Sequence, residues 1–172
     1  VQPSQVFGLL GENGAGKTTT IAMLTGLYPP SSGDALVNGF SILDEINDVY
    51  HSIGVCPQFS VLWDILTVRE HLYFFARLKG VPMLSERKHV NKALRDYGLK
   101  AVADRLAGAL SGGMKRRLCV AIALVGGSRV VFLDEPTTGL DPVSKRQLWS
   151  IVSGSRTGRV IILTTHDLFE AE

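Results

Sequence analysis

One segment constrains the fold of this chain more than any other: residues 11–18, which read Gly-Glu-Asn-Gly-Ala-Gly-Lys-Thr. The segment fits the pattern G-x-x-x-x-G-K-[ST], and it lies between the apolar run Val6–Leu10 and a stretch of helical composition over residues 17–27. Glycines allow successive backbone N–H groups to point into one concavity, and the N-terminus of the following helix adds partial positive charge. A glycine-rich turn that only caps a helix is the alternative, but the strand–loop–helix context favours a phosphate-binding loop.

The end of this loop carries the chemistry expected of a phosphate site. We expect the ammonium of Lys17 to reach the β- and γ-phosphates of a nucleotide. We expect the hydroxyl of Thr18 to ligate Mg²⁺, which takes phosphate oxygens and few protein ligands. The loop residues predicted to bind the nucleotide are Gly11, Asn13, Gly14, Ala15, Gly16, Lys17, Thr18 and Thr19.

Two adjacent acidic residues follow a second apolar strand. Asp134 and Glu135 come directly after Val130–Leu133, and ligands of open α/β sheets bind at the carboxyl ends of the strands. Asp134 is predicted to hold the metal ion, directly or through water, and Glu135 is the candidate general base. Taken alone, the pair could simply solvate a loop. Beside a phosphate loop, it predicts a catalytic centre.

Alternating strand and helix patterns predict an α/β fold. Further strands are expected at residues 53–56 and 160–163. We therefore predict a P-loop NTPase core with a mainly parallel sheet flanked by helices, together with an inserted helical subdomain. The core is expected to comprise about residues 1–60 and 109–172, and the helical lobe about residues 61–108.

Local signals predict where several helices begin and end. Thr67 and Glu70 form a capping-box pattern, and Ser85 is predicted to cap a second helix that ends at Gly98. Two further helix N-caps are predicted, at Ser111 and Asp141.

Composition narrows the class of protein. The formal net charge is only +2, which gives no electrostatic reason to expect a nucleic-acid partner. Two cysteines, Cys56 and Cys119, are too few for a disulfide scaffold and are expected to be reduced thiols in a packed interior. No apolar run approaches the roughly 20 residues of a membrane-spanning helix, so we expect no membrane span within the chain.

The segment Leu110-Ser-Gly-Gly-Met114 indicates a particular family. It lies just before an apolar helix and the strand that carries the acidic pair. It resembles the signature sequence of ATP-binding-cassette (ABC) proteins, although that signature usually ends in Gln. The chain is thus similar to the nucleotide-binding domain of an ABC protein. The resemblance implies that Ser111, Gly112 and Gly113 contact the γ-phosphate of an ATP held by a second such domain, across a head-to-tail dimer.

Three further segments match the family by order and spacing. Gln58 resembles the glutamine that senses the metal and the attacking water, and His166 resembles the switch histidine that contacts the γ-phosphate. Gly139–Asp141 resembles the loop that crosses the dimer. The resemblance implies catalytic roles for Glu135, His166 and Gln58, and a metal site made by Thr18, Gln58 and Asp134.

Finer features resemble the A subfamily, large eukaryotic ABC transporters associated with lipids. They are Leu110–Met114, Leu62–His71 and Phe75–Gly80. The resemblance implies a motor domain that binds and hydrolyses ATP with Mg²⁺ and powers transport of a substrate such as lipid across or within a membrane. It further implies a place at the cytosolic face of that membrane. The implied partners are transmembrane domains and a second nucleotide-binding domain, in the same polypeptide, with no nucleic acid.

Two alternatives remain open at this point. One is a soluble ABC-type ATPase that acts on nucleic acid or ribosomes, and the other is a regulatory cassette that binds ATP without turnover. Chromosome-type members of the first class insert a long coiled coil between the segments that contain Gln58 and Ser111. The short segment here, without sustained heptads, disfavours that class.

The chain also departs from the family pattern. The family places an aromatic residue that stacks on adenine upstream of the phosphate loop, and only ten residues precede Gly11. We therefore expect a fragment of a longer polypeptide that binds nucleotide weakly by itself. Phe59, Leu62 and Trp63 are predicted either to form a docking groove for transmembrane helices or to belong to the core of the helical lobe.

Overall fold

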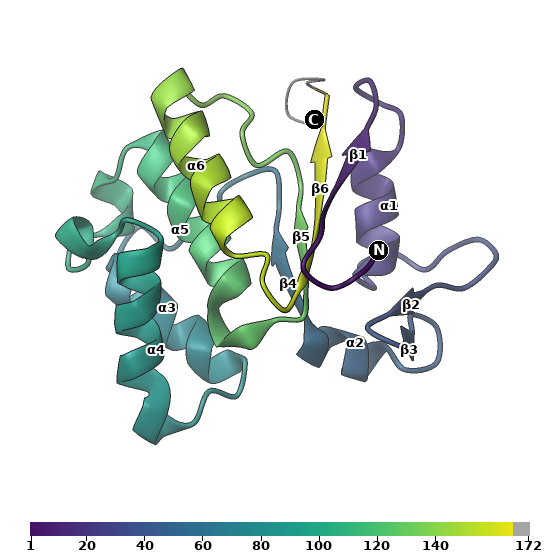
Figure 1. The fold of residues 1–172 in the computed structure, drawn as a ribbon, viewed down its shortest axis with the longest axis horizontal. Helices are drawn as coiled ribbons and strands as arrows, with labels where there is room; N and C mark the ends of the chain where they lie inside the picture. Colours follow the sequence, from purple (N-terminus) through teal and green to yellow (C-terminus); the bar gives the residue numbers. More distant parts are fainter. Residues whose placement is uncertain (167–172) are drawn as a thin grey trace. The chain divides into compact units, whose positions relative to one another are not determined.

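The computed structural model describes residues 1–166, and the contacts among them divide the chain into two compact units (Figure 1). The first unit combines strands and helices. It comprises residues 1–58, 128–136 and 156–166. The second unit is helical and comprises residues 59–127 and 137–155. It is larger than the lobe expected from the sequence, because it also contains α5 (Gly112–Leu124), which packs against α3, and α6 (Pro142–Gly154).

A four-stranded parallel sheet forms the centre of the first unit, which confirms the predicted fold class. In spatial order its strands are β1 (Val6–Leu10), β6 (Val160–Thr165), β5 (Val130–Leu133) and β4 (Ile53–Cys56). Every residue of β5 is buried, which explains why its sequence is an unbroken apolar run. The three strand runs identified from the sequence beside β1 are therefore the other three strands of this sheet.

The remaining elements of the first unit are short, and the sequence analysis missed most of them. They are α1 (Lys17–Leu24), the hairpin strands β2 (Leu36–Val37) and β3 (Phe40–Ser41), and α2 (Ile46–Ser52). The hairpin turns at Asn38 and Gly39, which have φ values of 55° and 90°. Two left-handed residues in succession match the twist of a tight hairpin, which explains the Asn-Gly pair.

Alternation along the central strands determines which side chains face α1. Val130 and Phe132 of β5 belong to one hydrophobic cluster with Ile21 of α1, and Ile162 of β6 packs against it. Because strand side chains alternate between faces, the next positions on the same face are residues 134 and 164. The core therefore determines which residues at the carboxyl ends of the strands lie on the side of the phosphate loop.

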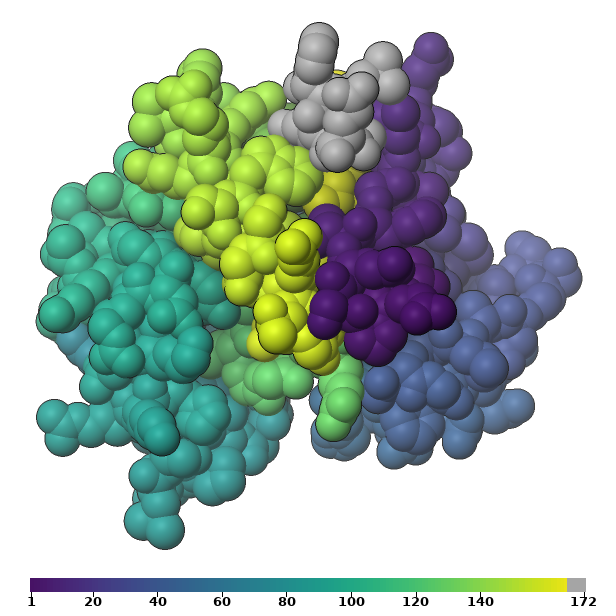
Figure 2. Space-filling view, viewed as in Figure 1, coloured from purple at the N-terminus to yellow at the C-terminus, as the bar shows by residue number. Residues whose placement is uncertain are grey.

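The N-terminal residues are tied to the segment that leads into β6. The backbone N–H of Ser4 donates to the carbonyl of Arg159 (2.8 Å), and the N–H of Gly158 donates to the Ser4 hydroxyl (3.0 Å). On the surface, the purple N-terminal residues lie against the yellow residues of this segment (Figure 2). These contacts hold the start of β1 against the segment before β6. They therefore support the register in which β1 pairs with β6, and so the place where the phosphate loop begins.

Helix starts in the second unit agree with the sequence signals except in one case. The capping box of Thr67 and Glu70 is present, and Ser111 and Asp141 cap their helices, as predicted. The prediction for Ser85 is wrong: α4 begins three residues earlier, with Pro82 as its N-cap, and the Ser85 hydroxyl donates to the carbonyl of Pro82 (3.0 Å). The fixed φ of proline favours this earlier start. The elements of this unit not yet given are α3 (Val68–Leu78), α4 (Met83–Asp96) and three short 3₁₀ turns, Lys100–Val102, Ala107–Ala109 and Val125–Gly127.

Within residues 1–166, none of the helices combines the length and the hydrophobicity needed to cross a bilayer.

Candidate functional site

The phosphate loop turns on two glycines. Gly14 and Gly16 have φ values of 85° and 92°, in the left-handed region that strains residues with a side chain. Gly16 is also the N-cap of α1, so the helix begins at Lys17, immediately after the second of these turns. A side chain on Gly11 would press on Ala15, with the two Cβ atoms 3.3 Å apart. The backbone path therefore favours glycine at positions 14 and 16, and the close packing of the loop favours it at position 11.

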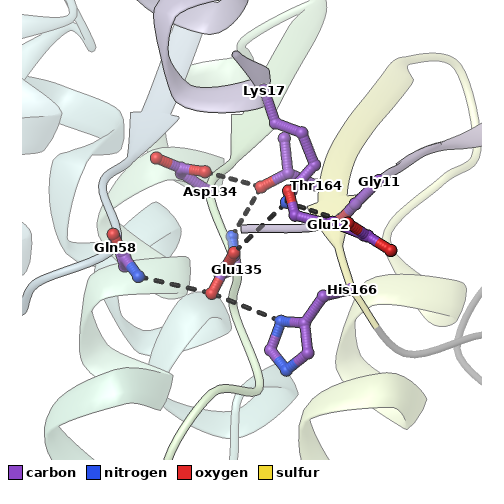
Figure 3. A network of polar contacts seen from close by, with 8 residues as sticks. All are labelled: Gly11, Glu12, Lys17, Gln58, Asp134, Glu135, Thr164 and His166. Atoms are coloured by element: carbon purple, nitrogen blue, oxygen red, sulfur yellow. Dashed lines mark hydrogen bonds and ion pairs between the residues drawn. The ribbon is translucent and has the colours of Figure 1, made fainter. Parts of the chain in front are cut away.

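The side chain of Lys17 points back into the loop (Figure 3). Its Nζ donates to the carbonyl oxygens of Gly11 (2.7 Å) and Glu12 (3.0 Å) and lies 3.7 Å from Glu135 Oε1. Only 7% of Lys17 is exposed. Other predicted loop ligands, namely Asn13, Ala15, Thr18 and Thr19, are exposed.

Glu135 is the point where the predicted catalytic side chains meet. Its Oε2 accepts a hydrogen bond from Gln58 Nε2 (3.3 Å) and lies 3.6 Å from His166 Nδ1, while its Oε1 faces Lys17. Gln58 follows β4, Glu135 follows β5 and His166 follows β6, so the three come from the carboxyl ends of three parallel strands (Figure 3). The structure thus brings together residues that are far apart in the sequence.

The sequence analysis missed Thr164. This fully buried residue of β6 donates from its hydroxyl to Asp134 Oδ1 (2.5 Å), and its hydroxyl oxygen accepts the backbone N–H of Glu135 (2.8 Å). A signal was available, because Thr164 lies two positions before His166 and therefore on the same face of the strand. The apolar run of β6 gives way to two threonines at its carboxyl end, and a polar residue at position 164 indicates a contact at the site.

The group is chemically suited to a phosphate chain and a cation. Asp134 and Glu135 are 4% and 8% exposed, and burying such charges is costly unless they are paired. The ammonium of Lys17 suits phosphate oxygens, and the carboxylate of Asp134 suits a divalent cation. Among the described residues, no cluster of three or more His, Cys, Asp or Glu side chains could hold a metal ion. The carboxylate of Asp134, together with phosphate oxygens, is a donor set that fits Mg²⁺, which takes one or two carboxylates in addition to phosphate oxygens.

The signature residues lie in the second unit. Ser111 caps α5, and its hydroxyl oxygen accepts the backbone N–H of Met114 (3.4 Å). Gly112 begins the helix, and a Cβ on Gly113 would lie 2.5 Å from the hydroxyl oxygen of Ser144 in α6. A glycine is therefore needed at position 113 for α5 and α6 to approach each other, whereas the group around Glu135 lies in the first unit.

Comparisons with known proteins agree with this geometry. A family model described as ABC transporter matches residues 1–138. "ABC transporter A family member 11" of Arabidopsis thaliana is 52% identical over the whole chain, and the bovine (Bos taurus) "Retinal-specific phospholipid-transporting ATPase ABCA4" is 54% identical over the whole chain. The chain spans 18% and 8% of the length of these two relatives.

The fold also matches solved structures. CbiO1 from Clostridium perfringens, part of the ABC transporter complex cbiONQ, superposes with a TM-score of 0.86 at 32% identity, over 97% of this chain and 69% of that one. An ATP-binding subunit of an ABC transporter gives the same TM-score at 29% identity, over 99% of this chain and 72% of that one. The chain therefore belongs to the ABC transporter family, has the fold of its ATP-binding subunits, and closely resembles members of the A family.

Proposed function

We propose that this chain is the ATP-hydrolysing motor domain of a membrane transporter. The observation that carries the proposal is the convergence of Lys17, Gln58 and His166 on the buried carboxylate of Glu135, beside a glycine-rich loop. Family membership supports ATP as the nucleotide. The name of the bovine relative, a phospholipid-transporting ATPase, supports a lipid as the transported substrate.

Each residue of the site has a distinct proposed role. Backbone N–H groups of the loop and the ammonium of Lys17 bind the phosphates, and Lys17 exchanges its two carbonyl partners for phosphate oxygens when ATP arrives. Thr18, Asp134 and Gln58 would hold Mg²⁺, which would neutralise charge on the phosphates.

Glu135 is the proposed general base. Its carboxylate is held from both sides, by Gln58 on one oxygen and by the ammonium of Lys17 near the other, so it is oriented before a water molecule arrives. His166 lies on the same side and is 47% exposed, which leaves its ring accessible to the γ-phosphate. Positioning and electrostatic stabilisation account for most of the catalysis in phosphoryl transfer.

A Glu135→Gln variant tests this assignment. The amide keeps the shape and the contact with Gln58 but cannot accept a proton, so ATP binding should persist while the hydrolysis rate falls about 100-fold or more. Binding and phosphate release would be measured on the complete protein that carries this chain. The control is Asp44→Asn, an exposed carboxylate of the first unit. Unchanged hydrolysis in Glu135→Gln would remove Glu135 from this role, and absence of ATP turnover in the unaltered protein would refute the proposed function.

A second nucleotide-binding domain, in the same polypeptide, is proposed to complete each site. Ser111, Gly112 and Gly113 lie at the N-terminus of α5, where backbone N–H groups and the helix dipole suit a phosphate. In a head-to-tail pair, each domain would present this N-terminus to the γ-phosphate held by the other. ATP would then favour the closed pair because it contacts both domains.

Transmembrane domains are the other proposed partners, at the cytosolic face of the membrane. Phe59 is 78% exposed and Trp63 is 47% exposed, so Phe59 does not belong to the core of the helical unit, while Leu62 is intermediate. A neighbouring groove of about 690 Å³ on the same unit is lined by Leu66, Glu70, Tyr73, Phe74, Arg77 and Leu78. An exposed apolar surface next to a groove suits a short amphipathic segment of a partner.

Replacing Phe59 tests this docking surface. Phe59→Ala removes an exposed ring, so thermal stability should change little, while transport should fall relative to ATP hydrolysis. Leu84→Ala, at a fully exposed leucine of α4 outside the groove, is the matched control. Coupled transport at the original rate in Phe59→Ala would contradict the docking role.

A further inference from the structure

The hydroxyl of Thr164 occupies an unusual place between two acidic residues. It donates its hydrogen to Asp134 Oδ1 at 2.5 Å, and its oxygen accepts the backbone N–H of Glu135 at 2.8 Å (Figure 3). Thr164 is fully buried, so water does not replace either interaction. One side-chain oxygen thus connects the side chain of the proposed metal ligand to the backbone of the proposed base.

The backbone of Glu135 needs such an anchor. Its φ is 42°, in the left-handed region, which is costly for a residue with a long side chain. Such a conformation persists only when surrounding contacts hold it, and the hydrogen bond from its N–H to Thr164 is one of them. The direction of the Glu135 carboxylate depends on this backbone conformation, because the backbone dihedral angles determine the direction of the Cα–Cβ bond.

The bond to Asp134 is of the strong kind. A hydroxyl that donates to a carboxylate at 2.5 Å is charge-assisted, and in a buried place it restricts the carboxylate to one orientation. The second oxygen of Asp134 then has a defined direction relative to the phosphate loop. A methyl group in place of the hydroxyl would leave both the carboxylate oxygen and the Glu135 N–H without this partner.

We propose that Thr164 is a positioning residue that sets Asp134 and Glu135 relative to each other for ATP hydrolysis. This inference rests on the proposed function, because it assigns Thr164 to the same reaction. Thr164 touches neither the nucleotide nor the water in this role. It acts through the two acids, and its place on β6 also connects them to the strand that His166 follows.

Thr164→Val and Thr164→Ser separate positioning from packing. Valine keeps the shape and removes the hydroxyl, so we expect kcat to fall about 10- to 100-fold with KM for ATP changed less than about threefold, as for a misplacement of about 1 Å. Serine keeps the hydroxyl and should restore kcat to within about threefold of the unaltered protein. The binding readout is the gain in ATP affinity on adding Mg²⁺, measured by titration. It should shrink in Thr164→Val, while ATP affinity without Mg²⁺ stays the same.

Two further variants keep the experiment decisive. Thr25→Val is the control, because it removes a different hydroxyl of the first unit, which donates to the carbonyl of Ile21 at the end of α1 and contacts neither acid. If Thr164→Val does not fold, Thr164→Cys serves instead, since it keeps the volume with a much weaker donor, and the same loss of kcat is expected.

Three results would overturn the inference. They are an unchanged kcat in Thr164→Val or Thr164→Cys, a loss in Thr164→Ser as large as in Thr164→Val, or an equal loss of kcat in Thr25→Val. Failure of the unaltered protein to hydrolyse ATP would be a different result, because it would refute the proposed function itself. All measurements use the complete protein.

Discussion

His71 is a fully buried imidazole that uses both ring nitrogens. Nδ1 lies 2.8 Å from the carbonyl oxygen of Thr67, and Nε2 lies 3.0 Å from the backbone nitrogen of Trp63. A backbone N–H can only donate, so Nε2 accepts and Nδ1 carries the hydrogen that Thr67 accepts. The ring also stacks on the indole of Trp63, with centroids 5.7 Å apart. His71 therefore connects Trp63, which precedes the helix, to Thr67 at the start of α3 through two hydrogen bonds.

Replacing His71 should destabilise the helical unit. His71→Leu leaves the Trp63 N–H without its acceptor, so the free energy of unfolding should fall by about 1–3 kcal/mol. Denaturant titration of the complete protein measures this change. His89 makes the same contact with the carbonyl four residues earlier but is exposed, so His89→Leu should stay within about 0.5 kcal/mol. Equal effects of the two variants would show that His71 has no special role.

At the scale of elements, the helix starts show that the same type of capping residue acts as an N-cap in one place and not in another. Thr67 and Asp141 cap α3 and α6 with their side chains, and both accept backbone N–H groups of the first turn. Ser85 has the same chemistry but lies inside the first turn of α4, because Pro82 starts the helix earlier. A capping residue thus acts only where its own backbone is extended, as at Thr67 and Asp141.

The caps predict a ranking of alanine variants. Thr67→Ala and Asp141→Ala should each lower the free energy of unfolding by about 1 kcal/mol, whereas Ser85→Ala should change it by less than about 0.5 kcal/mol. Equilibrium unfolding followed by circular dichroism gives the three values. A loss at Ser85 as large as that at Thr67 would contradict the helix start seen here.

Long, strongly patterned segments were predictable from the sequence, and short or irregular ones were not. Val130–Leu133 is apolar throughout, so its strand was evident, and the phosphate loop has a motif of its own. The hairpin strands β2 and β3 have two residues each, too few to show a period. The roles of Thr164 and His71 depend on contacts between distant segments, which no local pattern records.

At the scale of the whole molecule, the carboxyl groups of residues 1–166 that have a lowered pKa lie in the helical unit. Hydrogen bonds from Arg77 lower the pKa of Glu86, and those from Arg69 lower the pKa of Asp104. The backbone N–H groups at helix starts contribute as well. The backbone N–H of Thr67 lowers the pKa of Glu70. The pKa of Asp141 is lowered first by a hydrogen bond from the Ser144 side chain and then by backbone N–H groups. All four carboxylates belong to the second unit.

Acid should therefore destabilise the helical unit. A carboxyl whose pKa is lower in the folded state stabilises the fold above its unfolded pKa of about 4, and this contribution is lost as the pH falls further. The free energy of unfolding should stay nearly constant from about pH 7 to pH 5 and decrease below about pH 4. Hydrogen exchange at the amides of residues 68–96 would report the change.

Glu86→Gln identifies one source of this dependence. The variant should be less stable than the unaltered protein at pH 7, because it loses the ion pair with Arg77, and its stability should fall less steeply below pH 4. Asp48→Asn, at an exposed position of α2, serves as the control. An acid dependence in Glu86→Gln as steep as in the unaltered protein would exclude this pair as a source.

The order of the main sheet leaves β1 at one end, and among the residues that the structure describes no strand pairs with its outer side. Two exposed apolar side chains, Phe7 and Leu10, lie along it. An edge strand with unpaired backbone N–H and C=O groups can pair with a strand of another molecule. A strand added there would bond to the outer backbone groups of residues 6–10, and Phe7→Lys would place a charge beside it.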